Sequence, residues 1–161
     1  MRFFFALALA AVIAGCGLLG GAADLTAIEV AGRYEFTDYT VEPTAGSVDS
    51  RNLEDELDDA TLLLTESGEA RVERLRGGRP DRTLATGVYS ISGREVTVTF
   101  RDRGDLDELL MPRSVTFDAD GSRLRTEVFL EGVNLEELSD DYRGITRADV
   151  NLKISLREIG A

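Results

Sequence analysis

From residue 28 onward, apolar and polar residues alternate with a period of two. A typical segment places Val96, Val98 and Phe100 between polar neighbours. Such alternation is typical of antiparallel strands that bury one face in a shared core. The pattern predicts eight strands, at 28–41, 60–66, 69–76, 82–91, 94–101, 113–118, 123–130 and 146–158.

The lengths of the connections indicate how these strands are arranged. Three connections are tight and contain glycine, at 67–68, 92–93 and 119–122, as short hairpins require. Three others are long, at 42–59, 102–112 and 131–145, and the connection at 77–81 is intermediate. Alternate connections of a meander lie at the same end, so the long loops would gather at one rim. We therefore predict an all-β fold, a single eight-stranded antiparallel up-and-down barrel, with a β-sandwich as the alternative.

Each long loop has leucines at helical spacing among acidic residues, which predicts short helical turns. A potential N-cap precedes each group, namely Asn52, Asp105 and Asn134, and Pro112 would end the second turn. The leucines and Met111 would either fold inward as a lid or anchor the loops to the barrel. We favour anchoring, because long unanchored loops are uncommon in compact domains. The leucines are Leu53, Leu57, Leu106, Leu109, Leu110, Leu135 and Leu138.

The N-terminus has the pattern of an export signal. Met1-Arg2 precedes an apolar run from Phe3 to Ile13, and Ala14, Gly15 and Cys16 follow. The run is shorter than the ~20 residues of a membrane-spanning helix, which disfavours a transmembrane or buried helix. Ile13-Ala14-Gly15-Cys16 resembles the lipobox of bacterial lipoproteins. We expect a signal peptide at 1–15, a lipidated Cys16 with a flexible tether to residue 27, and a barrel domain at 28–161.

The resemblance implies a location in the cell envelope. Cys16 would carry acyl chains such as palmitate and would hold the protein on a membrane, which is the partner that the sequence predicts most directly. Gly17 follows the cysteine, and in the sorting pattern of such lipoproteins this implies the outer membrane, facing the periplasm, when the cell has two membranes. In a single-membrane cell the location would be the outer face of the plasma membrane.

Composition excludes several classes of function. The chain has 30 acidic and 18 basic residues, so its net charge is −12, which argues against nucleic-acid binding. It contains no histidine and one cysteine, so no His-based triad or metal site can be assembled. We expect no enzymatic activity, no cofactor and no metal.

The acidic residues have simpler explanations than catalysis or calcium binding. The clusters at 54–59, 105–108 and 136–141 lie in polar loops, which favours solvated charge over paired catalytic carboxylates. Asp118-Ala119-Asp120-Gly121 resembles the opening of a calcium loop, but it leads directly into a strand. A hairpin turn is the better interpretation.

Two segments carry a family resemblance. Gly32-Arg33-Tyr34 on the first strand and the run from Thr86 to Val98 are similar to lipocalin-like, calycin-type β-barrels of bacterial lipoproteins. In that family an arginine of the last strand packs over the aromatic residue of the first strand. The resemblance implies that Arg157 packs over Tyr34 and closes one end; the alternative is that Arg157 points into water.

The expected function is to bind or carry a small apolar molecule inside the barrel. The alternative is a structural or interaction lipoprotein with a packed barrel, no ligand and a protein partner that the sequence does not name. An eight-stranded barrel has room for packed side chains or for one small ligand. The residues expected to line a ligand are Tyr34, Phe36, Leu64, Val98, Phe100, Phe117, Val128 and Ile154.

Overall fold

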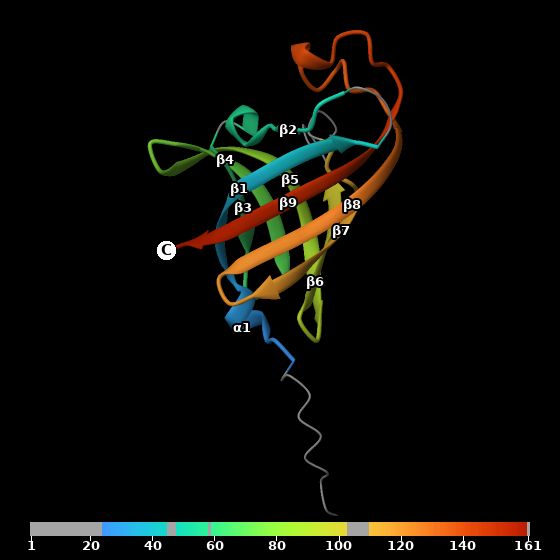
Figure 1. Ribbon diagram of the computed structural model, residues 1–161. Coiled ribbons are helices and arrows are strands. Elements are labelled where there is room, and N and C mark those ends of the chain that lie inside the picture. Colours follow the sequence, from blue (N-terminus) through green and yellow to red (C-terminus); the bar gives the residue numbers. More distant parts are fainter. Residues whose placement is uncertain (1–23, 45–47, 58, 103–109, 161) are drawn as a thin grey trace, which may run out of the picture.

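The computed structural model describes residues 24–44, 48–57, 59–102 and 110–160, which form one antiparallel sheet (Figure 1). The strands in this part of the chain are β1 (Gly32–Pro43), β2 (Arg51–Asn52), β3 (Ala60–Leu64), β4 (Glu69–Arg76), β5 (Arg79–Ser92), β6 (Glu95–Asp102), β7 (Ser114–Asp120), β8 (Arg123–Val133) and β9 (Ala148–Ile159).

The sheet closes into a barrel because the first strand pairs with the last. The β1–β9 register runs from Arg33 opposite Ile159 to Pro43 opposite Val150. Strands β1 and β3 to β9 form the eight staves, and β2 is a two-residue addition that pairs with Thr40 and Val41. The predicted eight-stranded antiparallel barrel is therefore confirmed, and the sandwich alternative is wrong.

The two ends of the barrel differ, as predicted. Tight turns join β3 to β4, β5 to β6 and β7 to β8 at one end, which we call the tight-turn end. The longer connections lie at the opposite end, the loop end. The predicted intermediate loop at 77–81 is wrong, because β5 already begins at Arg79. A two-residue turn suffices there since Gly77 and Gly78 adopt φ values of 60° and 76°.

The first predicted strand begins later than expected, because residues 27–30 form a short helix. This helix is α1 (Ala27–Val30), and it lies at the tight-turn end. Thr26 caps it, and both its backbone N–H and its hydroxyl donate hydrogen bonds of 2.8 Å to Glu29 Oε2. Val30 is buried and starts the core.

A bulge in β1 changes which side chains face the core. Before the bulge Tyr34 and Phe36 point inward, whereas after the register shift between Phe36 and Asp38 the inward residues are Tyr39 and Val41. One extra residue reverses the alternation of a strand. The uniform alternation that the sequence suggests therefore ends at Thr37.

The loop end contains two short 3-10 helices among the described residues. The first is Glu54–Leu57, and Asn52 caps it as predicted, since Asn52 Oδ1 accepts the Glu54 N–H at 3.0 Å. The second is Asp140–Tyr142, and its N-cap is Ser139. The helical turn predicted after Asn134 is present as a single turn, in which the Leu138 N–H donates to the Leu135 carbonyl at 3.0 Å, but among the described residues Asn134 Oδ1 accepts no hydrogen bond and so does not cap it. The turn expected around Leu106 and Leu109 lies outside the described residues.

Candidate ligand-binding region at the loop end of the barrel

The eight residues expected to line a ligand all belong to one hydrophobic core. Seven of them have relative exposures between 0% and 6%, and Val128 is half-buried against the same core. The side chains are brought together by the alternation of six different strands. The seven buried residues are Tyr34, Phe36, Leu64, Val98, Phe100, Phe117 and Ile154.

The tight-turn end is closed by α1 and by two tyrosines. Tyr34 Oη donates a hydrogen bond of 2.8 Å to the Val30 carbonyl, and Tyr89 Oη donates one of 2.7 Å to the Thr65 carbonyl. Burial, helped by the nearby Glu158 carboxylate and by Tyr89, raises the pKa of Tyr34 to about 12. This end therefore serves as a neutral, hydrogen-bonded floor.

Arg157 does not take part in this closure, contrary to the expectation drawn from the family resemblance. In the β1–β9 register Tyr34 lies opposite Glu158, whereas Arg157 lies opposite Glu35 and so faces the outer wall. Arg157 Nε donates a hydrogen bond of 3.0 Å to Glu35 Oε1. The alternation of the strands therefore places Tyr34 inside the barrel and Arg157 outside it, and the Tyr34 hydroxyl bonds to the Val30 carbonyl of α1.

The wall of the barrel is incomplete between β7 and β8. The two strands pair only from Asp118 opposite Arg125 to Asp120 opposite Arg123, whereas β8 remains paired with β9 as far as Val133. Beyond Arg125 the inward side chains of β8 are only half-buried, although their neighbours on β9 are fully buried. These half-buried inward residues are Thr126, Val128 and Leu130.

Tyr39 lies in the same inward row as Thr126 of this half-buried face. It lies opposite Ile154 on β9, and Ile154 lies opposite Thr126 on β8, so the three form one inward row. Tyr39 is 0% exposed, and its hydroxyl has no hydrogen-bond partner among the described residues. Burial raises its pKa above the ordinary value of 10.0, so the hydroxyl remains a hydrogen-bond donor even at alkaline pH. An unpartnered hydroxyl in a core is costly, and it is a natural contact for a polar atom of a ligand.

Tyr39 was not predicted as a site residue from the sequence. The sequence does contain a sign of its inward position, because the alternation of apolar and polar residues shifts by one residue before it. After Thr37 the apolar positions move from even to odd numbers, at Tyr39 and Val41, while Asp38 and Thr40 take the polar positions. A strand with such a change contains a bulge.

The side chains of the loop end mainly anchor the loops. Leu53, Leu57, Met111 and Leu135 are each at most 3% exposed and belong to the core, whereas Leu110 and Leu138 are partly buried against it. Anchoring, the favoured alternative, therefore describes these loops better than a lid. Leu106 and Leu109 lie outside the described residues.

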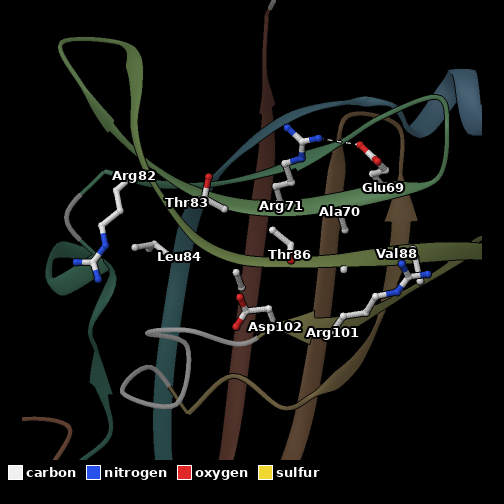
Figure 2. Close-up of a pocket in the computed structure, with 12 residues that line it drawn as sticks. Glu69, Ala70, Arg71, Arg82, Thr83, Leu84, Thr86, Val88, Arg101 and Asp102 are labelled. Atoms are coloured by element: carbon white, nitrogen blue, oxygen red, sulfur yellow. Dashed lines mark hydrogen bonds and ion pairs between the residues drawn. The ribbon is translucent and has the colours of Figure 1, made fainter.

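A separate pocket of about 720 Å³ lies on the outer wall, across β4, β5 and the end of β6 (Figure 2). Its polar lining includes Arg71, Arg82 and Arg101. Figure 2 shows Arg71 directed toward Glu69, with which it forms an ion pair of 2.9 Å, while Arg82 extends in the opposite direction. The arginines diverge, so they do not present one binding centre.

The described residues contain no group of three acidic or cysteine side chains placed to hold a metal ion. Asp118 and Asp120 of the calcium-like segment lie on β7 and at its end, where both face Arg94, at 3.8 Å and 3.2 Å. Arg94 Nη2 also donates to the Ala119 carbonyl at 2.8 Å. The segment is a hairpin, as the sequence suggested.

Comparison with known proteins adds no relative, since no family model matches the chain and no curated protein has a similar sequence. In the part of the chain described, no helix is both long enough and apolar enough to cross a bilayer.

Proposed function

We propose that this protein is an exported lipoprotein, acylated at Cys16, whose lipocalin-like barrel holds a small apolar molecule at its loop end. The ligand contacts the inward face of β8, at Thr126, Val128 and Leu130, and places one polar atom against the Tyr39 hydroxyl. The buried residues nearer the tight-turn end, such as Tyr34 and Leu64, form the floor beneath the ligand. The proposed site therefore lies nearer the loop end than most of the eight residues that the sequence predicted to line a ligand.

The observation that carries this proposal is the early separation of β7 from β8. The separation leaves inward apolar side chains half-buried where the rest of the row is fully buried. Burying the exposed part of Val128 and Leu130 against an apolar ligand is favourable by about 25 cal/mol per Å². The unpartnered Tyr39 hydroxyl in the same row favours a ligand with one hydrogen-bonding group over a pure hydrocarbon.

The position of the N-terminus agrees with membrane anchoring. The described chain begins at Asp24, beside α1 and the tight-turn end (Figure 1). The eight peptide steps between Cys16 and Asp24 span at most about 28 Å. The loop end then faces away from the anchoring membrane, toward the periplasm if the membrane is the outer membrane of a diderm cell.

The test compares two adjacent positions on one strand. Val128→Glu places a charge on the inward face of β8, whereas Phe129→Glu places the same charge on a side chain that is outward and 54% exposed. The full-length proteins are purified from bacterial membranes and extracted with organic solvent, and the extracts are compared by mass spectrometry. We expect one apolar compound from the wild type and from Phe129→Glu, and little from Val128→Glu.

Thermal unfolding establishes that the Val128→Glu protein is folded before its extract is interpreted. Wild-type extracts without an apolar compound would contradict the proposal. Equal amounts of the compound in the Val128→Glu and Phe129→Glu extracts would show that the ligand does not contact the inward face of β8.

A second function is favoured because the residues predicted to line a ligand, apart from Val128, are almost completely buried. Seven of the eight are at most 6% exposed, as in a barrel filled by its own side chains. Such a barrel would act as a structural or interaction lipoprotein that binds another envelope protein. Crosslinking in intact cells, followed by purification under several detergents, separates the two functions. A constant crosslinked partner together with an empty extract supports the second one.

A further inference from the structure

Three arginines surround a shallow pocket on the outer wall of β8, β9 and β1, close to the tight-turn end. The pocket has a volume of about 260 Å³, and Thr37, Asp38, Ser155 and Leu156 complete its lining. The arginines are Arg123, Arg125 and Arg157. The pocket lies outside the barrel, so it is independent of the apolar region proposed above.

The register brings like charges together here. Arg123 lies directly opposite Arg157, and Arg125 lies opposite Ser155 on the same face. Like charges directly opposite each other on neighbouring strands are destabilising. A bound anion would remove this repulsion, and in a protein with a net charge of −12 a concentration of positive charge is otherwise unexpected.

The nearest carboxylates leave most of this charge uncompensated. Asp120 and Asp118 are the β7 partners of Arg123 and Arg125, but both carboxylates face Arg94, in the turn before β6, instead. Within the described ranges, the side chains of Arg123 and Arg125 form no hydrogen bond and no ion pair.

The other acidic groups nearby are either engaged by a neighbouring side chain or do not line the pocket. Glu35 binds Arg157, and Asp38 accepts a hydrogen bond of 2.6 Å from Thr40 Oγ1. Glu127, the next outward residue of β8, is not among the residues that line the pocket, and Lys153 opposite it forms an ion pair of 2.6 Å with Glu42. Two guanidinium groups are therefore left free at the pocket, beside a third that has a single carboxylate partner.

We propose that Arg123, Arg125 and Arg157 form a binding site for a phosphate group, carried by a small soluble molecule or by a lipid headgroup. The planar guanidinium presents paired N–H donors that match phosphate oxygens, so arginine suits this ligand better than lysine. The Ser155 hydroxyl lines the same pocket and can donate one further, neutral hydrogen bond, whereas the Thr37 hydroxyl already donates to the Ser155 carbonyl at 3.2 Å.

The experiment titrates glycerol 3-phosphate into the full-length protein in an uncharged maltoside detergent at low ionic strength, by calorimetry. We expect a Kd below about 1 mM for the wild type, weakened by added salt. Arg125→Gln should raise the Kd about tenfold, because a charge-assisted hydrogen bond is lost. The matched control is Arg101→Gln, which removes the same charge from an exposed arginine outside this pocket and should leave the Kd unchanged.

A parallel titration with micelles of dihexanoyl phosphatidic acid distinguishes the source of the phosphate. Binding of glycerol 3-phosphate that depends on Arg125 supports a soluble ligand, whereas binding that depends on Arg125 only with the micelles supports a headgroup. If the wild type binds neither probe, or if Arg125→Gln and Arg101→Gln behave alike, the proposal is overturned. Neither variant should alter the apolar extract, so this test is separate from that of the barrel ligand.

Discussion

The guanidinium of Arg33 on β1 and the carboxylate of Glu73 on β4 are 2.8 Å apart, although strand β3 lies between their strands. Thr61 on β3 joins them, since it accepts a hydrogen bond of 2.8 Å from Arg33 Nη1 and donates one of 3.3 Å to the Glu73 carbonyl. Glu73 is only 6% exposed and Thr61 only 3%, although they lie on the outer wall. This network links β1, β3 and β4 through their side chains on the outer face of the barrel.

Replacing Arg33 by methionine should destabilise the fold, because the Glu73 carboxylate would be left buried without its counter-charge. Removing one partner of a buried ion pair costs about 3–5 kcal/mol. The Arg33 side chain is still 21% exposed, so water can partly replace it, and we expect a loss of about 2–3 kcal/mol in urea unfolding. The double variant Arg33→Met/Glu73→Leu should recover part of this loss. A single variant as stable as the wild type would show that the pair contributes little.

Gly87 on β5 should tolerate no side chain. A Cβ at this position would lie 2.3 Å from the carbonyl oxygen of Thr99 on β6, and backbone atoms cannot move aside as a flexible side chain can. We expect Gly87→Ala to cost more than about 2 kcal/mol through overpacking. The comparison is Gly121→Ala, where φ is +59° but no atom lies within 4 Å, so that only backbone strain of about 1–2 kcal/mol applies. Urea unfolding of both variants would contradict the prediction if Gly121→Ala were the more damaging.

The buried tyrosines predict a loss of stability at alkaline pH. The pKa of Tyr34 is raised from 10.0 to about 12 by burial and by nearby Glu158 and Tyr89, and burial also raises the pKa of Tyr39. Between pH 10 and 12 the unfolded chain has released the Tyr34 proton while the folded protein keeps it. The stabilisation is therefore complete below pH 10 and disappears as pH rises toward 12.

Tyr34→Phe provides the measurement for this effect. The variant loses the hydrogen bond to the Val30 carbonyl, so it should be less stable than the wild type at pH 7 by about 1 kcal/mol. Its urea midpoint should fall less steeply between pH 9 and pH 11 than that of the wild type, since one titrating group is gone. Parallel pH profiles for the two proteins would show that Tyr34 titrates normally in the folded state.

The alternation of side chains predicted the barrel well because each strand buries one face. Leu62, Val98 and Leu152 all take the inward positions that a period of two assigns to them. The tight turns at Gly68, Gly93 and Gly121 were equally readable, since each adopts a positive φ angle. Local chemistry was therefore sufficient to predict strand number, strand direction and the unequal ends.

The features that depend on pairing between distant strands were not predictable in this way. The bulge at Thr37, which turns Tyr39 inward, belongs to the pairing of β1 with β9 and is not a local property. Arg157, by contrast, points outward simply because Leu156 before it points inward. The short overlap of β7 with β8 likewise depends on where each strand curves away. The candidate site depends on the bulge in β1 and on the early separation of β7 from β8. Alternation alone therefore predicted Val128 as a lining residue but not Tyr39.

Asn52 links the cap of a loop helix to the candidate site, and its removal should affect both. Its Oδ1 accepts the Glu54 N–H at 3.0 Å and the Tyr39 N–H at 3.1 Å, so one side chain fixes the helix start and the backbone of β1. Asn52→Ala should cost about 1–2 kcal/mol, the usual value for a lost N-cap. The variant should also retain less of the apolar compound than the wild type, because the Tyr39 backbone is no longer held. Asn52→Asp keeps the accepting oxygen and should retain most of both properties; a loss equal to that of Asn52→Ala would show that these two hydrogen bonds do not position Tyr39.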